Sequence, residues 1–124
     1  TIYRNVPADI AVLQTTDYRV PALQLRNTQP EVELHIRIVG YPFGLHPVQV
    51  FAGQVSSLRT FVEDGYYMLF DMTACGGNSG SAVVDENDRV VSVLQIGFGP
   101  GCSPFTGGAP WEVMARLVGK YFKQ

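Results

Sequence analysis

The sequence is poor in charged residues and has no long apolar run. Only 16% of its 124 residues are charged, and nine Lys and Arg against eleven Asp and Glu give a formal net charge of −2. Because no basic cluster could neutralise a phosphate backbone, we expect no nucleic-acid partner. A bilayer-spanning helix needs roughly 18 or more successive apolar residues. No such run is present, so we expect no membrane partner, and the first residues, TIYRNVPADI, do not have the pattern of a signal peptide.

Cysteine and histidine are scarce as well, with two of each. Cys75 and Cys102 are too few for a disulfide-rich scaffold, and no paired Cys or His spacing accompanies them that would hold zinc. We therefore expect no metal and no cofactor. The residues alone leave open whether the two cysteines form one disulfide or remain as buried thiols that act as small apolar groups.

Glycine and proline are frequent, and they divide the chain into short segments. Thirteen Gly and eight Pro separate stretches rich in Val, Ile, Tyr, Phe and Thr, which favours an all-β fold. Alternation from Glu31 places Val32, Leu34, Ile36 and Ile38 on one face of a half-buried strand. The predicted strands cover residues 10–13, 31–38, 48–56, 66–71, 81–84 and 90–96, with a turn at 40–44 and a hairpin formed by the last two strands.

The two ends of the chain differ from the middle. Residues 10–13 form a short apolar run that we expect to be buried on both faces, and residues 14–30 are typical of a connecting stretch. After Pro110 the apolar residues recur at helical spacing, which predicts one C-terminal helix. The residues with this spacing are Trp111, Met114, Leu117, Val118, Tyr121 and Phe122.

The motif CGGNSGS at residues 75–81 is the strongest candidate for chemistry. It places Ser79 between glycines and directly before an apolar strand, as suits an exposed nucleophile on a tight loop. Glycines allow successive backbone N–H groups to turn toward one point, where they could bind a developing oxyanion. The alternative is a Gly-Ser turn that merely joins two strands, and the motif alone does not decide between them.

Four stretches in the same order give the context of this motif. TACGGNSGSAVV resembles the nucleophile loop of the trypsin and chymotrypsin family, PADIAVL the segment with its catalytic Asp, and GPGCSPFTGGAPWEVMARLVGKYFKQ its terminal loop and helix. GYPFGLHPVQVFAGQVSS is similar to the corresponding stretch of bacterial Htr-type and glutamyl-specific members. The resemblance implies the second barrel of a two-barrel chymotrypsin-like fold. Residues 1–30 would be the last strand of the first barrel and a linker, 31–108 the second barrel, and 109–124 the closing helix.

The resemblance also implies the roles of individual residues in a serine endopeptidase. Ser79 would be the nucleophile, Asp9 would orient and support the catalytic base, and the N–H groups of Gly77 and Ser79 would form the oxyanion hole. A primary pocket for substrate is implied at Thr73, Ala74, Cys75, Gly76 and Gly97. Asp9 has an alternative reading as a strand-entry residue that hydrogen-bonds a nearby turn.

Three further details follow from the family pattern. Cys75 and Cys102 match a disulfide that borders the primary pocket, so we expect them to be bonded, which favours an extracellular or other oxidising compartment, with a viral source possible. Asn78 stands where trypsin has an Asp that pairs with the new N-terminus, so activation through that ion pair is not expected. Ser81 replaces a Gly, and we expect no effect on the chemistry.

The catalytic base is the missing part. Acyl transfer by Ser requires a general base within hydrogen-bond reach. His35 lies on the polar face of its predicted strand, and His46 follows the 40–44 turn, so neither is suited to the task. We expect the base to come from an N-terminal fragment of the same precursor, and the substrate to be a peptide or protein. The alternative from another class is a non-catalytic protease-like binding, capsid or interaction module that has lost the base.

Overall fold

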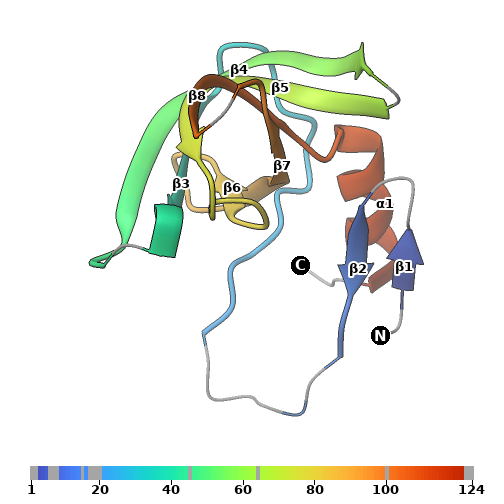
Figure 1. Ribbon diagram of the computed structural model, residues 1–124. Coiled ribbons are helices and arrows are strands. Elements are labelled where there is room, and N and C mark those ends of the chain that lie inside the picture. Colours follow the sequence, from blue (N-terminus) through green and yellow to red (C-terminus); the bar gives the residue numbers. More distant parts are fainter. Residues whose placement is uncertain are drawn as a thin grey trace.

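The computed structural model describes residues 3–5, 9–14, 16, 21–44, 46–63, 65–99 and 101–121. Within these residues, six antiparallel strands close into a barrel in the order β3–β4–β5–β8–β7–β6 (Figure 1). The strands are β3 (His35–Gly40), β4 (Gln49–Val62), β5 (Gly65–Cys75), β6 (Ala82–Val84), β7 (Val90–Gly97) and β8 (Cys102–Gly108). The helix α1 (Trp111–Tyr121) follows, so the predicted all-β barrel with one C-terminal helix is confirmed.

Alternating side chains place the core inside the barrel. Along β3, Ile36 and Ile38 are buried while His35 and Val39 face solvent, as a period of two requires. The same alternation on the other strands completes one continuous apolar cluster, whose burial is the main driving force for this fold. Its buried members are Ile36, Ile38, Val55, Met68, Phe70, Met72, Ala74, Val83, Val91 and Leu94.

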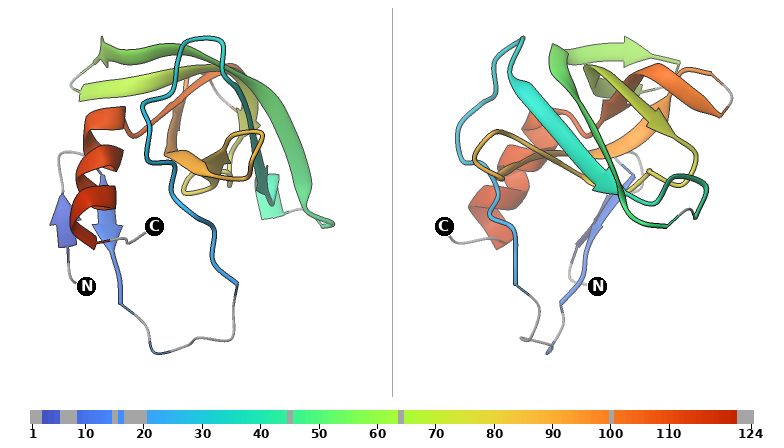
Figure 2. Two further views of the ribbon diagram at one scale, coloured as in Figure 1. Left: turned by 180° about the vertical axis from the view of Figure 1, so that it is seen from behind. Right: turned by 90° about the vertical axis from the view of Figure 1, so that its left-hand side faces the viewer.

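The hairpin of β4 and β5 is the longest feature of the sheet and extends beyond the barrel wall (Figure 2). Near its tip, the rings of Phe61 and Tyr66 lie 5.0 Å apart between centroids, and the Arg59 guanidinium lies 3.6 Å above the Tyr66 ring. Arg59 Nε also lies 2.9 Å from Glu112 Oε1 of α1. Cation–π contact and ion pair together tie the hairpin to the start of the helix.

A second small sheet lies outside the barrel. It pairs β1 (Tyr3–Asn5) with β2 (Ile10–Val12). This small sheet lies next to α1, outside the barrel (Figures 1 and 2). Met114 of α1 belongs to a second apolar cluster with Val84 and Val90, against which Ile10 packs. The described helices include none that is long and apolar enough to span a membrane.

The sequence-based strands are corrected in three places. Residues 31–34 form a turn, closed by a Leu34 N–H to Glu31 O bond of 3.2 Å, so Val32 is half exposed rather than buried. The residues 10–13 are not buried on both faces, because β2 pairs only with β1 among the described strands and Leu13 is 71% exposed. The strand β8 was not predicted at all.

Parts of two other predictions fall outside the described residues. They are Phe122 of the predicted helix and residues 15 and 17–20 of the predicted connection. Residues 24–26 of that connection run alongside β7, with Arg26 N–H bonded to Val90 O at 2.9 Å and Val90 N–H to Gln24 O at 2.8 Å.

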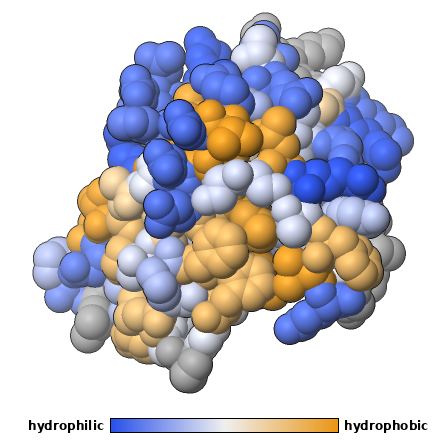
Figure 3. All heavy atoms as spheres, turned by 90° about the horizontal axis from the view of Figure 1, so that it is seen from above, coloured by the Kyte–Doolittle hydropathy of each residue, from blue (hydrophilic) through white to orange (hydrophobic). Residues whose placement is uncertain are grey.

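The surface of the molecule is not uniformly polar. On the face seen in Figure 3, apolar surface extends through the centre and the lower part, and hydrophilic surface gathers along the upper and right-hand margins. Large apolar side chains are exposed at several places on the molecule, including Phe43, Val50, Phe61, Tyr66 and Phe105. Contiguous exposed apolar surface is typical of a contact surface rather than of a surface exposed only to water.

Candidate active site

The loop that carries Ser79 connects β5 to β6 and is held at both ends. Its first turn is closed by Asn78 N–H donating to Cys75 O at 3.0 Å, and its end by Gly80 N–H donating to Leu94 O at 2.7 Å. Gly77 and Gly80 have φ angles of 95° and 91°, a region that glycine enters without the steric cost of a Cβ. The chain therefore turns sharply on both sides of Ser79, whose side chain is exposed.

Gly77 is required at its position for a second reason. A Cβ there would lie 3.0 Å from both the Phe43 nitrogen and the Tyr41 carbonyl oxygen. The loop thus packs directly against the backbone of the turn after β3. In the described part of the chain, neither the Gly77 N–H nor the Ser79 N–H donates to a backbone carbonyl. Both predicted oxyanion donors are therefore free of backbone partners there.

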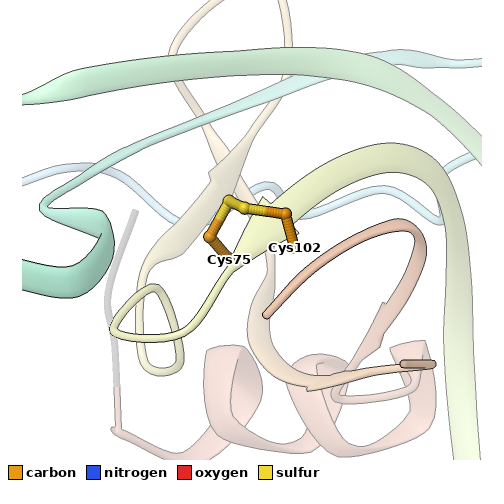
Figure 4. The surroundings of a disulfide bond; sticks show 2 residues. All are labelled: Cys75 and Cys102. Carbon is orange, nitrogen blue, oxygen red and sulfur yellow. A yellow bond between two sulfur atoms is a disulfide. The ribbon is translucent and has the colours of Figure 1, made fainter. Parts of the chain in front are cut away.

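A disulfide anchors the start of this loop. Cys75 at the end of β5 is bonded to Cys102 at the start of β8, as the sequence analysis expected (Figure 4). The two residues are also register partners across the sheet. A cross-link at this place limits how far the loop and the neighbouring Gly101 segment can separate.

A cavity of about 250 Å³ opens beside Ser79. Four of the five residues predicted for the primary pocket line it, namely Ala74, Cys75, Gly76 and Gly97. The fifth, Thr73, is exposed on β5 and does not belong to the lining. The residues that sequence reasoning missed are Leu94, Ile96, Gly99, Gly101, Ser103 and Thr106.

The lining of this cavity is uncharged. Its hydroxyl groups also take part in the fold, because Thr106 Oγ1 donates to Met72 O at 2.9 Å and Ser103 Oγ lies 2.7 Å from Phe105 O. Ser103 Oγ further accepts the N–H of Phe98 at 3.1 Å. The cavity thus offers apolar surface and small side chains, without a cation or a carboxylate.

Asp9 borders a different cavity, of about 400 Å³. Its walls include Ile10, Val12, Met114 and also Gly80, the residue after Ser79. Asp9 is exposed, has a positive φ of 54°, and its carbonyl accepts a hydrogen bond from Gln95 Nε2 at 3.3 Å. The fold thus brings Asp9 and the end of the nucleophile loop to one hollow.

Neither histidine lines that hollow. His35 is exposed on β3, with Nδ1 3.8 Å from Glu86 Oε1, and it lines a separate cavity of about 370 Å³. His46 is also exposed, and its ring lies 5.0 Å from that of Tyr41. Within the described residues, no histidine lines the cavities bordered by Ser79 or Asp9.

Asn78, the residue before Ser79, is buried beside β3. Its side chain is fully buried, and among the described residues neither Oδ1 nor Nδ2 has a hydrogen-bond partner. Gly40 makes this position possible, since a Cβ there would lie 2.9 Å from Asn78 Oδ1. A neutral amide costs less to bury than a carboxylate would.

The turn between β6 and β7 contains a largely buried ionic contact, between Asp85 and Arg26. Asp85 is 4% exposed, and its Oδ1 accepts the N–H groups of Asn87 at 2.8 Å and Arg89 at 3.0 Å. Its Oδ2 lies 3.1 Å from Arg26 Nη1. Burial raises the pKa of Asp85, but the hydrogen bonds from Arg89, Asn87 and Arg26 and the charge of Arg26 together outweigh it and hold the pKa below its usual value. The described residues contain no group of His, Cys, Asp and Glu that could hold a metal ion.

Comparison with known proteins identifies the family. The model of the trypsin-like peptidase domain matches residues 1–93. Glutamyl endopeptidase of Staphylococcus aureus is 33% identical over 76 residues, which cover 59% of this chain and 21% of that protein. Among solved structures, the HtrA-type protease AlgW with a decapeptide matches 94% of this chain and 39% of its own, with a TM-score of 0.76 and 22% identity.

A variant of AlgW with a tripeptide has the same TM-score of 0.76 and covers 95% of this chain and 41% of its own. The chain thus spans about a fifth of the length of the curated relative and about two fifths of the solved chains. The fold, the order of the motifs and the match of the domain model over residues 1–93 agree. The chain belongs to the trypsin-like peptidase family.

Proposed function

We propose that this chain is the nucleophile-bearing part of a serine endopeptidase. Ser79 Oγ attacks the scissile carbonyl, its proton passes to a general base, and the leaving amine departs to give an acyl-enzyme that water then hydrolyses. The main support for this proposal is the position of Ser79. Ser79 is exposed at the edge of a cavity of about 250 Å³, on a loop whose N–H groups at Gly77 and Ser79 have no backbone acceptor in the described chain.

In this proposal the two N–H groups stabilise the oxyanion that forms on the carbonyl oxygen. Preorganised donors of this kind lower the barrier because they need no reorientation during the reaction. Asp9 orients the base and supports its positive charge, consistent with its place in the same hollow as Gly80. The base itself is a histidine from sequence outside this chain, because neither His35 nor His46 is among the residues that line the cavities bordered by Ser79 and Asp9. This chain covers about two fifths of the length of the solved relative, which is consistent with a histidine supplied by another part of the protein.

We further propose that the residue before the cleaved bond is small or apolar. A substrate Lys or Arg would need a buried anion and a substrate Glu a buried cation, and the cavity beside Ser79 has neither among its described residues. Leu94 and Ile96 supply apolar surface instead. In this respect we expect the chain to differ from the relative named glutamyl endopeptidase.

A non-catalytic protease-like interaction module is the second candidate. The observation in its favour is that no described histidine lies at the site. The two candidates differ in the reactivity of Ser79, because a serine without a base does not react with serine-directed probes at an enzymatic rate.

The deciding experiment labels the protein with a fluorophosphonate probe, using this chain together with its upstream sequence. We expect Ser79 to be labelled, the Ser79→Ala variant to lose labelling and peptidase activity by several orders of magnitude, and Ser56→Ala, an exposed serine on β4, to behave as the unaltered protein. Labelling that persists in Ser79→Ala would contradict the assignment of the nucleophile. An unlabelled parent protein would favour the interaction module.

A second experiment tests where the base resides. Residues 1–124 are compared alone and together with the upstream fragment, by probe labelling and by native mass spectrometry. We expect labelling only when the fragment is present and a complex of both chains in the mass spectrum. A fully active monomer of residues 1–124 would overturn this part of the proposal.

The Cys75–Cys102 disulfide supports an extracellular or otherwise oxidising compartment.

A further inference from the structure

The turn after β3 makes a contact with the nucleophile loop that the motif alone did not indicate. Phe43 N–H donates to the carbonyl oxygen of Gly76 at 2.6 Å. The turn itself is closed by Gly44 N–H donating to Tyr41 O at 3.0 Å. Phe43 has φ 54° and ψ 23°, so it lies in the left-handed region, which non-glycine residues seldom occupy.

This hydrogen bond determines the orientation of a whole peptide group. The carbonyl of Gly76 and the N–H of Gly77 belong to the same planar trans peptide and point in opposite directions. When Phe43 N–H holds the carbonyl on its side, the Gly77 N–H must point away from the turn. If the peptide rotated by half a turn, the Gly77 N–H would face the Phe43 N–H. The Gly76 carbonyl, an acceptor, would then occupy the place where the Gly77 N–H now serves as a donor.

Two further observations show that the contact is close and specific. The Phe43 ring lies over Gly76, because a Cβ on Gly76 would be 3.3 Å from Phe43 Cε1. A Cβ on Gly77 would be 3.0 Å from the Phe43 nitrogen. Yet the Phe43 side chain is 57% exposed and does not belong to the barrel core. Its position is explained by the nucleophile loop better than by the stability of the barrel.

We propose that Phe43 is a positioning residue, whose N–H keeps the Gly76–Gly77 peptide in the orientation that presents the Gly77 N–H to the oxyanion. The inference rests on the proposed function, since the Gly77 N–H is an oxyanion donor only if Ser79 acts as a nucleophile. The left-handed conformation of Phe43 is part of the device, because it lets the chain close the turn from Gly44 N–H to Tyr41 O while the Phe43 N–H stays bonded to the loop.

The first test changes the backbone preference of residue 43 in the active full-length protein. Phe43→Val and Phe43→Asn both remove the ring, but a β-branched residue disfavours positive φ while Asn tolerates it. We expect Phe43→Val to lower kcat about 10- to 100-fold, near or below the loss of an oxyanion donor, with KM changed less than about 3-fold. Phe43→Asn should retain at least about ten times the kcat of Phe43→Val.

The second test removes only the N–H. Replacing Phe43 by its α-hydroxy acid converts the amide to an ester and leaves the ring in place. We expect kcat and the affinity for a peptidyl trifluoromethyl ketone, which forms an oxyanion at Ser79, to fall in parallel, about 10-fold or more. Binding of the amine-side product peptide, which has no oxygen at the oxyanion position, should stay within about 2-fold. The same replacement at Phe61, at the tip of the β4–β5 hairpin, is the control and should leave all three quantities unchanged.

The outcomes are separable. Retention of kcat and ketone affinity within about 2-fold in the ester variant would overturn the inference, as would equal activity of Phe43→Val and Phe43→Asn with unchanged thermal unfolding. Equal losses of ketone and product binding, with a lowered unfolding temperature, would also overturn it, because they indicate general disruption. If the parent protein neither turns over peptide nor reacts at Ser79, the proposed function fails, whatever the variants do.

Discussion

The buried contact between Asp85 and Arg26 makes a quantitative prediction about stability. Asp85→Asn keeps the size of the side chain and one acceptor for the N–H groups of Asn87 and Arg89. It removes the charge, and the amide of the new residue turns an N–H toward the Arg26 guanidinium, where the carboxylate oxygen lies at 3.1 Å. The guanidinium, which is 16% exposed, then lacks its nearest anion.

The expected loss follows from these contacts. A hydrogen bond to a charged group contributes about 1.5–3 kcal/mol, and removing one partner of a buried ion pair costs about 3–5 kcal/mol. Arg26 has a second carboxylate nearby, since its Nη2 lies 3.6 Å from Glu31 Oε2, and this places the loss at the lower end. We expect the free energy of unfolding to fall by about 3 kcal/mol at pH 7.

The effect should depend on pH with a definite sign. The pKa of Asp85 is lower in the folded chain than in the unfolded chain, because the hydrogen bonds from Arg89, Asn87 and Arg26 outweigh the effect of burial. The carboxylate therefore stabilises the fold above the unfolded pKa of about 3.9, and this stabilisation is lost as the pH falls through the folded pKa. The difference between the two proteins should be full near neutral pH and should shrink below about pH 4.

Urea unfolding between pH 3 and pH 7 measures both quantities. The matched control is Asp88→Asn, which removes an exposed ion pair with Arg37 in the same region and should cost at most about 1 kcal/mol. A loss below about 1 kcal/mol for Asp85→Asn at pH 7, or a difference that grows as the pH falls, would refute the reasoning.

Three other perturbations have defined outcomes. Replacing Cys75 and Cys102 by Ala opens a loop with a separation of 27 residues and should cost about 3.5 kcal/mol in urea unfolding; a loss under about 1 kcal/mol would contradict the loop-entropy argument. Asn78→Asp buries a carboxylate without a partner, which raises its folded pKa, so its stability should fall as the pH rises from about 4 to 8, and a flat profile would be inconsistent with burial. Gly97→Val should narrow the cavity, since a Cβ there lies 3.4 Å from Ser103 Cβ, so a peptide library should show a stronger preference for Ala over Leu before the cleaved bond.

The fold class could be predicted because the apolar patterns of individual segments match the strands and the helix that these segments form. Residues 81–84 and 90–96 alternate or run apolar around a polar turn, and they do form the hairpin of β6 and β7. The helix after Pro110 follows from apolar spacing alone. These elements succeed because each buries its apolar side chains against the barrel, as its own pattern requires.

The failures have physical reasons as well. The alternation around Val32 suggested a strand, but Glu33 has a positive φ of 76°, which breaks the period of two before β3 begins. The strand β8 contains Pro104 and ends in Gly107 and Gly108, residues that normally weaken a strand. Gly108 is needed there because a Cβ on it would collide with the Val93 carbonyl, so close packing between strands outweighs the low strand preference of glycine.

The residues of the candidate site could be predicted only in part. Sequence motifs identified Ser79 and four residues of the cavity, because they are adjacent in the chain to the CGGNSGS motif or match the family pattern. Leu94 and Ser103 were missed, since they reach the cavity only through the pairing of β7 and β8 with the rest of the barrel. The Phe43 contact had one faint signal, a large apolar residue inside a glycine-rich turn.

The supports of the nucleophile loop differ in what they can transmit. Leu94, which holds the end of the loop, is a core residue, so displacing it would disturb the barrel. The disulfide fixes the start of the loop covalently. The Phe43 contact differs from these two, because it is made by an exposed side chain and one hydrogen bond outside the core. If Ser79 is the nucleophile, as proposed, a displacement of this turn would change the orientation of the Gly76–Gly77 peptide, and with it the rate of acylation, without unfolding the barrel that positions Ser79.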